Sequence, residues 1–400
     1  MKKLFTVMAA AAFMLPAMAD EPLETEGSGF LTSALNSYIE SNMAAPENGS
    51  KQEEMTYGRD VKGFASAPKF GGYFIGKYSY KDQDNYPTAF DSNNKPTKWN
   101  NPTRGGGFSQ RLIRLYVDGT ILKDFKYRIQ LQTNNDGFHM KDFFVEWAHY
   151  DFFKVKVGQF KRAFGFENPM NPWDISTGDY SLMTKYLTGH NDYLGTDADT
   201  KGSANGGRDQ GIQVQGDFLK VSNNSSKDQY YLFHYQLMVS NGTGINCADN
   251  DAKKDITGTL QIQPIKNFYI GAFGWKGTYR SGGKEYDRKR AAFGAKYENK
   301  GWSARAEYAY GRTNNSSKGN ADAWYVVGGM PVNDWFKLSA QYQTARISRS
   351  WNSAQCIYSL IPEFQLHKNL KVQIQYNYND VRTSLDRHFN ELWVETYVRF

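Results

Sequence analysis

Basic side chains recur at alternate positions in short segments of this sequence. In FKYRIQLQTN, Lys126 and Arg128 alternate with Phe125, Tyr127 and Ile129. Successive side chains of an extended strand point to opposite faces, so the basic residues of such a segment share one face. A surface on which lysine and arginine gather attracts anions and repels cations. Anion binding is therefore the first chemistry that these residue types predict.

The polar faces of such segments carry more basic than acidic residues. The basic residues that we assign to these faces are Lys77, Arg114, Lys126, Arg128, Lys154, Lys156, Arg162, Arg305, Lys337 and Lys371. The clearest acids on the same faces are Asp118, Asp142, Glu146, Glu307, Glu391 and Glu395. This excess predicts a preference for small hydrophilic anions. The alternative is that the charges pair across neighbouring strands, as Arg305 and Glu307 could, and only stiffen the wall.

Residues suited to catalysis or metal binding are scattered. The six histidines are His139, His149, His190, His234, His367 and His388. The sequence has no G-x-S-x-G, H-E-x-x-H or phosphate-cradling glycine loop. With only two cysteines, Cys247 and Cys356, a disulfide-built scaffold and a thiolate metal cluster are excluded, whereas a disulfide between these two stays open. We expect no enzyme, no cofactor and no bound metal.

The elements that position the basic residues are alternating strands. LKVQIQYNYN, residues 370–379, alternates strictly between apolar and polar side chains, which predicts a strand with one face of each kind. Sixteen such segments can be counted, and they lie near residues 70–80, 107–118, 125–134, 140–148, 153–163, 209–218, 229–240, 254–264, 268–277, 288–297, 302–311, 322–330, 335–347, 355–366, 370–379 and 390–400.

Two fold classes can accommodate these strands, a soluble sandwich and a transmembrane barrel. A mean hydropathy of -0.67 does not decide between them, because only alternate residues of a barrel touch lipid. The aromatic content of 16% suits interfacial girdles. Connections after even-numbered strands are brief apart from the one near 219–228, and those after odd-numbered strands are usually longer, as in outer-membrane barrels. We therefore predict an all-β fold, a transmembrane antiparallel β-barrel of about 16 strands.

Both ends of the chain fit this location. Residues 1–19 have a basic start, a short apolar run and an A-x-A cleavage site, which is typical of a secretory signal peptide. Residues 20–66 are predicted to form an acidic periplasmic leader with a short helix, with a disordered tail as the alternative, and 67–400 to form the barrel. The last segment, ELWVETYVRF, ends on Phe400, the kind of tail by which the outer-membrane assembly machinery recognises barrels. The predicted location is the cell outer membrane, in contact with its lipid, and nucleic acid is not expected as a partner.

A barrel of this size leaves an aqueous channel that something must narrow. The longest connection, about residues 164–207, follows the fifth strand and is long enough to fold inward as a constriction loop. Trp173 is placed to pack it on the wall, while Lys185 within it and Arg208 at its exit could set the constriction. The alternative is a mobile external loop.

Three segments resemble the phosphate-selective porin O and P family. They are FSQRLIRLYVDGTILKDFKYRIQLQ, KDFFVEWAHYDFFKVKVGQFKRAFGFE and GGRDQGIQVQG. The matching positions include Arg111, Arg114, Gly119, Val157, Gly158, Gln159, Phe160, Lys161, Phe164, Gly165, Glu167, Gly207, Arg208, Asp209 and Gly211. The resemblance implies a homotrimeric, sixteen-stranded outer-membrane porin.

The chain also departs from the family pattern. Ala163 stands where proline is usual, and Leu112 and Ile113 thin the basic run of the second strand. We therefore expect passive diffusion of small hydrophilic solutes with an anion preference, and phosphate selectivity as a narrower expectation. The alternative is an occluded barrel that acts as a binding or adhesion protein.

Overall fold

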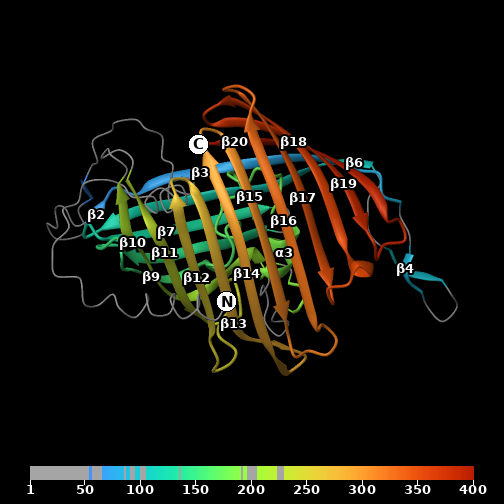
Figure 1. Cartoon of the computed structure of the whole chain (residues 1–400), viewed down its shortest axis with the longest axis horizontal. Coiled ribbons are helices and arrows are strands. Elements are labelled where there is room, and N and C mark those ends of the chain that lie inside the picture. Colours follow the sequence, from blue (N-terminus) through green and yellow to red (C-terminus); the bar gives the residue numbers. More distant parts are fainter. Residues whose placement is uncertain are drawn as a thin grey trace.

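The computed structural model of the chain is shown in Figure 1. It describes residues 54–55, 65–84, 87–90, 95–99, 105–134, 137–190, 192–195, 205–222 and 229–400. The predicted signal peptide lies outside the described residues, as does most of the predicted leader with its short helix. The predictions about these segments therefore stay predictions.

Sixteen antiparallel strands form a closed ring, as the alternating segments predicted. They are β3 (Lys69–Lys81), β6 (Gly105–Ile121), β7 (Phe125–Asn134), β8 (Gly137–Trp147), β9 (Lys154–Lys161), β10 (Arg208–Ser222), β11 (Gln229–Ser240), β12 (Asp255–Ile265), β13 (Phe268–Ser281), β14 (Lys284–Asn299), β15 (Trp302–Arg312), β16 (Asn320–Pro331), β17 (Phe336–Ile347), β18 (Gln355–His367), β19 (Leu370–Val381) and β20 (His388–Arg399). Each strand pairs with its neighbours in sequence, and β20 pairs with β3. Closure leaves no free strand edge along the ring.

A few short elements of the described part of the chain are not strands of the ring. β1 (Glu54–Met55) pairs with β2 (Ala65–Ser66), which also pairs with β6, and β4 (Pro87–Phe90) forms a hairpin with β5 (Pro96–Trp99). The helical elements are α3 (Leu182–Leu187), η2 (Asn205–Gly207) and η4 (Trp351–Ser353). Among the described residues, no helix is long and apolar enough to cross a membrane.

The two ends of the barrel differ in their connections. We call the end with the turns 122–124, 266–267 and 300–301 the short-turn end, and the opposite end the long-loop end. The start of β3 and the end of β20 lie at the short-turn end. At the long-loop end, β13 and β14 meet in a two-residue turn of Gly282 and Gly283, with φ of 60° and 72°. The sequence predicted a longer connection here, between residues 277 and 288. In the structure β13 and β14 continue through these residues, and two consecutive glycines form the tight turn between them.

The apolar side chains of the ring point outward and the polar ones inward. Along β19, the side chains of Lys371, Gln373 and Gln375 are buried inside the ring, whereas Tyr376 and Tyr378 are exposed on its outside. Phe108 on β6 is 91% exposed. In a soluble sandwich this arrangement would be reversed. The alternation of LKVQIQYNYN therefore reflects a polar interior and an apolar exterior of the barrel.

A charge on this apolar exterior should oppose folding in lipid. Val326 lies in the middle of β16 and is 53% exposed. We expect Val326→Arg to lower the free energy of unfolding of the protein in phospholipid vesicles by about 2–4 kcal/mol, since arginine is costly near the bilayer midplane. Urea titration of vesicle-folded protein, followed by tryptophan fluorescence, measures this change.

The matched control is Leu385→Arg, in the turn between β19 and β20, where the side chain is 79% exposed. A position near the interface should cost about 0–1 kcal/mol. Equal costs for the two variants would contradict a lipid-facing exterior at Val326.

Candidate functional site

The connection between β9 and β10 folds into the barrel, as predicted. We call residues 162–207 the inner loop, of which 191 and 196–204 lie outside the described part. Its helix α3 lies inside the ring and contacts β15, β16 and β17 (Figure 1). The loop side chains buried against the wall of β13 to β17 are Phe164, Phe166, Leu182, Met183, Leu187 and Leu194. Burial of these apolar side chains stabilises the loop in its position inside the barrel.

Trp173 fixes the loop to another part of the wall. Its ring lies edge-on to Tyr73 of β3 at 6.0 Å and to Tyr397 of β20 at 5.8 Å between centroids. The Arg399 guanidinium lies 4.2 Å from the centroid of the Trp173 ring. Edge-to-face aromatic pairs and cation–π contacts each stabilise such packing. The loop is thus held to β3 and β20 as well as to β13 to β17.

A buried carboxylate on the wall binds the backbone of the loop. Glu307 of β15 accepts hydrogen bonds from the backbone N–H of Phe166 at 2.6 Å and of Glu167 at 3.0 Å. Arg305, two residues earlier, donates to Glu167 Oε1 at 3.1 Å and to the Tyr325 hydroxyl at 2.7 Å. Glu307 also accepts a hydrogen bond from the Tyr325 hydroxyl. Arg305 and Glu307 therefore act on the loop instead of lining an open wall.

Inward-facing amides satisfy further backbone groups of the loop. Gln343 of β17 accepts a hydrogen bond from the Leu182 N–H at 2.7 Å, which lies in the first turn of α3. On β19, Gln375 accepts from the Gly178 N–H at 2.6 Å and Gln373 donates to the Ser176 carbonyl at 2.9 Å. Backbone groups away from water need such partners. The polar face of LKVQIQYNYN thus serves partly to hold the loop.

The two ends of the inner loop are joined by ion pairs and a tight turn. Arg162 pairs with Asp209 at 3.0 Å and lies over the Trp275 ring, 4.6 Å from its centroid. Asn168 donates to the carbonyls of Arg162 at 2.9 Å and Gly207 at 3.3 Å. A Cβ at Gly207 would lie 2.1 Å from Asn168 Oδ1, and φ there is +60°. Only glycine fits this position without strain.

His190 completes this junction as a neutral side chain. Burial, with the nearby charges of Lys161 and Arg208, holds the pKa of His190 well below its usual range. Its Nε2 lies 2.9 Å from Asn168 Oδ1. A neutral ring with hydrogen on Nε2 donates to this oxygen. The histidine therefore orients Asn168 and adds no charge to the interior.

Four basic side chains gather where the inner loop meets β6 to β10, and we call them the cation cluster. Its members are Arg114, Lys141, Lys161 and Arg208. Arg208 forms a bidentate pair with Asp142 at 2.8 and 3.0 Å. A Cβ at Gly206 would lie 2.9 Å from Arg208 Nη1 and 3.9 Å from Lys141 Nζ, so these two cations end near each other.

The other two cations of the cluster converge on adjacent residues of the inner loop. Arg114 donates to Gln132 Oε1 at 2.9 Å and to Asn171 Oδ1 at 3.5 Å. Lys161 donates to the Tyr180 hydroxyl at 2.8 Å and to the Met170 carbonyl. In the described part of the chain, Arg114, Lys141 and Lys161 form no ion pair. With Asp142 as the acid, the cluster carries an excess of positive charge.

Sequence reasoning missed Lys141 because a β-bulge turns it inward. Gln130 of β7 lies opposite both Lys141 and Asp142, since Ile129 pairs with Phe143 and Leu131 with Met140. Lys141 and Asp142 are both buried inside the ring. A signal was present, because the outward apolar residues Phe138, Met140, Phe143 and Val145 change their spacing from two to three at this point.

Most of the predicted pore-lining cations are paired with acids. Seven of the ten form ion pairs: Lys77 with Glu395 (3.7 Å), Arg128 with Asp118 (2.8 Å), Lys154 with Asp217 (3.0 Å), Lys156 with Glu146 (3.6 Å), Arg162 with Asp209 (3.0 Å), Arg305 with Glu167 (3.1 Å) and Lys371 with Glu363 (2.8 Å). Lys126 lies opposite Glu146 in the register of β7 and β8. Lys337 lines a cavity beside the inner loop. Lys185 in α3 pairs with Asp179 at 2.6 Å.

The remaining residues that the sequence singled out lie apart from the inner loop. Cys247 and Cys356 are both buried free thiols and are not bonded to each other. Phe400 is 59% exposed and exchanges two backbone hydrogen bonds of 3.0 Å with Gly72 of β3. Within the described ranges, no three His, Cys, Asp or Glu side chains gather in a way that could hold a metal ion.

The family model of phosphate-selective porin O and P matches residues 88–244. This match spans β6 to β11, the inner loop and the cation cluster. The resemblance indicated by the three sequence segments is thereby confirmed. A comparison with curated proteins gave no match.

Solved outer-membrane proteins share the fold. The anion-selective porin from Comamonas acidovorans is similar with a TM-score of 0.59 and 12% identity, over 84% of this chain and 100% of that one. The outer-membrane channel DcaP of Acinetobacter baumannii gives a TM-score of 0.54 at 12% identity, over 86% and 100%. OmpT of Vibrio cholerae gives 0.53 at 11% identity, over 87% and 100%. At such identities the likeness shows the fold alone.

Removal of the Arg305 guanidinium should release the inner loop. Arg305→Met leaves Glu167 and Glu307 buried without their cation, a change that typically costs about 3–5 kcal/mol. We expect the loop to become sensitive to protease and the Tm of detergent-solubilised protein to fall. Limited proteolysis with mass spectrometry locates cleavage within 162–207.

The control is Lys253→Ala, which removes the exposed ion pair with Glu285 in a connection at the long-loop end. An exposed pair contributes little, so this variant should match the wild type. A loop in Arg305→Met that resists protease as well as the wild type would contradict the anchoring role.

Proposed function

We propose that the protein is an outer-membrane porin through which small hydrophilic solutes diffuse passively, with a preference for anions. The observation that carries the proposal is the position of the cation cluster at the inner loop, inside the barrel. The fold shared with an anion-selective porin supports it. The function is that of a channel rather than an enzyme.

The proposed path runs from the long-loop end to the short-turn end. Solutes enter among the long loops, pass between the inner loop and the wall of β6 to β10, and leave beside the short turns. The apolar contacts of the loop lie mainly with β3, β20 and β13 to β17. On the side of β6 to β10 the loop meets the polar side chains of Arg114 and Lys161, and the passage is placed along this polar side. Positive charge there raises the local concentration of anions.

Phosphate is proposed as one permeant anion and not as the sole one. The match to the phosphate-selective family supports phosphate. However, Arg111 on the second barrel strand is engaged by Glu395 at 3.3 Å and by Asp179 at 3.5 Å. The donors left for a phosphate are then Arg114 and Lys161 with Lys141. This smaller set favours general anion passage over strict phosphate selection.

A second candidate is an occluded barrel whose long loops bind a partner. It is favoured by one observation: every cation of the cluster is 6% exposed or less. Such low exposure fits either a narrow aqueous constriction or a closed one. Electrical conductance distinguishes these two cases.

We expect refolded protein in a planar bilayer to give single-channel current steps and an anion-selective reversal potential under a salt gradient. Lys141→Gln and Arg114→Gln should each lower the anion-to-cation permeability ratio about sevenfold. One charge roughly 7 Å from the path attracts an anion and repels a cation by about 0.6 kcal/mol each in water, so its loss shifts the ratio by about 1.2 kcal/mol. Phosphate added to chloride should compete for passage.

The matched control is Lys81→Gln, which removes a cation paired with Glu391 near the long-loop end of β3 and should leave the ratio almost unchanged. Insertion without current would overturn the porin and favour the occluded barrel. A cation-selective reversal potential would overturn the anion preference alone.

We further propose that three copies of the chain form a homotrimer, supported by the family resemblance and by the trimer form of OmpT among the similar structures. Light scattering of detergent-purified protein, corrected for bound detergent, should give three times the mass of the mature chain. A monomeric mass in several detergents would contradict this assembly.

A further inference from the structure

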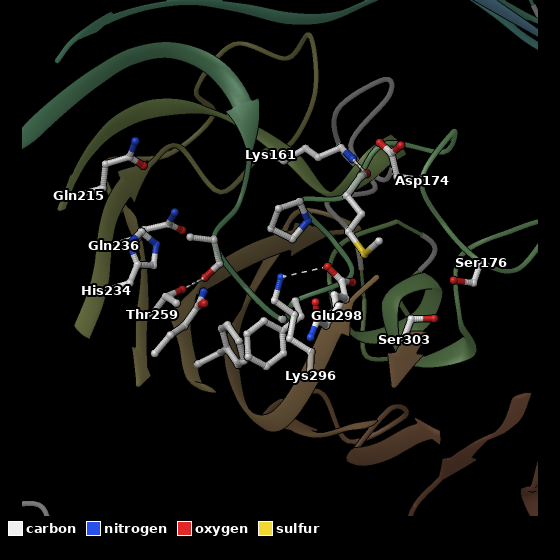
Figure 2. Close-up of a pocket in the computed structure, with 18 of the residues that line it drawn as sticks. Lys161, Asp174, Ser176, Gln215, His234, Gln236, Thr259, Lys296, Glu298 and Ser303 are labelled. Atoms are coloured by element: carbon white, nitrogen blue, oxygen red, sulfur yellow. Dashed lines mark hydrogen bonds and ion pairs between the residues drawn. The ribbon is translucent and has the colours of Figure 1, made fainter. Parts of the chain in front are cut away.

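A cavity of about 470 Å³ lies between the inner loop and the short turn at 300–301. Its lining divides into two chemical halves (Figure 2). Gln215, Gln236, His234 and Thr259 lie on one side of the view, and Lys161, Asp174, Lys296 and Glu298 lie toward the other. A wall rich in side-chain amides, which we call the amide wall, therefore faces a charged wall across the cavity.

The amide wall is continuous across three strands. Gln215 of β10, Gln236 of β11 and Thr259 of β12 stand side by side in register. In the next row, His234 of β11 stands beside Gln261 of β12. Three neighbouring strands span about 10 Å. The patch is thus wide enough to contact several groups of one small molecule at once.

Several amides of this wall lack protein partners. The Gln213 side chain is 3% exposed, and its Oε1 has no hydrogen-bond partner. In the part of the chain that the structure describes, the side-chain amides of Gln236 and Gln261 make no hydrogen bond either. An amide oxygen only accepts, so Gln213 Oε1 requires a donor such as a hydroxyl group. Bare anions such as chloride carry none.

The charged wall has an excess of lysine. Four lysines lie on it, against Asp174 and Glu298 as acids: Lys161, Lys296, Lys300 and Lys337. A fifth, Lys156 of β9, stands beside Gln213 on the opposite wall and pairs with Glu146 at 3.6 Å. Lys296 approaches Glu298 only at 4.0 Å, and Lys337 forms no ion pair with any described residue. A ligand group that meets this wall should carry negative charge.

We propose that the cavity is a binding site for a hydroxylated organic anion of the sugar phosphate class. The hydroxyl groups meet Gln213, Gln236 and Gln261, which donate and accept hydrogen bonds, and the anionic group meets Lys337 and Lys296. The inference rests on the proposed function, since it names a solute held below the inner loop during passage. Neither half of the lining alone would select for such a molecule.

The wall chemistry separates this class from simpler solutes. Inorganic phosphate would contact the lysines but would leave the glutamine amides without hydrogen-bond partners. A neutral sugar would satisfy the amides and leave the lysines without an anion. A molecule with both parts gains from both sets of contacts, because each part holds the other in place.

The test uses isothermal titration calorimetry on the full-length mature protein folded in detergent, with glucose 6-phosphate, glucose and inorganic phosphate as probes. Glucose 6-phosphate should bind at least about tenfold more tightly than either of the others. In the variant Gln236→Ala/Gln261→Ala its affinity should fall about tenfold toward that of phosphate, and in Lys337→Met toward that of glucose. Gln341→Ala, on an inward face outside the cavity, should bind as the wild type does.

Calorimetry reads binding whether or not the barrel conducts, so the two proposals fail separately. Equal affinities for glucose 6-phosphate and inorganic phosphate would overturn the amide contribution and with it the proposal. Absence of binding by glucose 6-phosphate, in protein that gives anion-selective current, would overturn the site while leaving the porin in place. Binding that none of the cavity variants alters would also overturn it.

Discussion

The backbone of the inner loop must find hydrogen-bond partners inside the barrel, and the rest of the interior is arranged around that need. Glu307 supplies two acceptors for consecutive N–H groups, while Gln343 and Gln375 supply one each. A buried backbone N–H without a partner costs as much as a lost hydrogen bond. Inward-facing residues such as Arg305 and Glu307, which strand periodicity assigns to the wall of the solute path, instead bind the loop.

That requirement also decides which charges remain available to a solute. Arg305 is needed because Glu167 and Glu307 lie close together in a buried place, and Arg162 is needed because Asp209 also accepts from the Gly242 N–H at 2.9 Å. A buried carboxylate that accepts backbone hydrogen bonds in this way stays charged at low cost only when a cation lies beside it. The excess positive charge gathers at β6 to β10, where Arg114 and Lys161 also donate hydrogen bonds to the loop. The main apolar anchor of the loop, at β13 to β17, lies on another part of the ring.

The fold could be predicted well from the sequence because side chains in each strand alternate between the apolar outside and the polar inside of the barrel. All sixteen segments, the closure and the inward fold of the long connection follow from that period and from connection lengths. The side chains of the site were harder to predict, for a physical reason. A single bulge at Lys141 reverses the alternation, and another leaves Arg111 unpaired between Leu112 and Gln110, so that Arg111 also reaches Glu395 inside. Ion pairing of Arg128 or Lys154 depends on neighbouring strands, which strand period alone does not reveal.

The asymmetry of the interior also explains why the long connection follows the fifth strand with glycines at its exit. The chain must leave β9, cross to the far wall for α3, and return beside its own start, where Arg162 N–H donates to the Gly207 carbonyl at 2.9 Å. This return brings Arg208 next to Lys141, although their strands are separated by β9. The cation cluster itself stands on β6, β8, β9 and β10, and the returning loop supplies the Asn171, Met170 and Tyr180 partners of Arg114 and Lys161. A loop that detached from the wall would remove these partners and widen the passage, so selectivity depends on the same contacts that set the width of the passage.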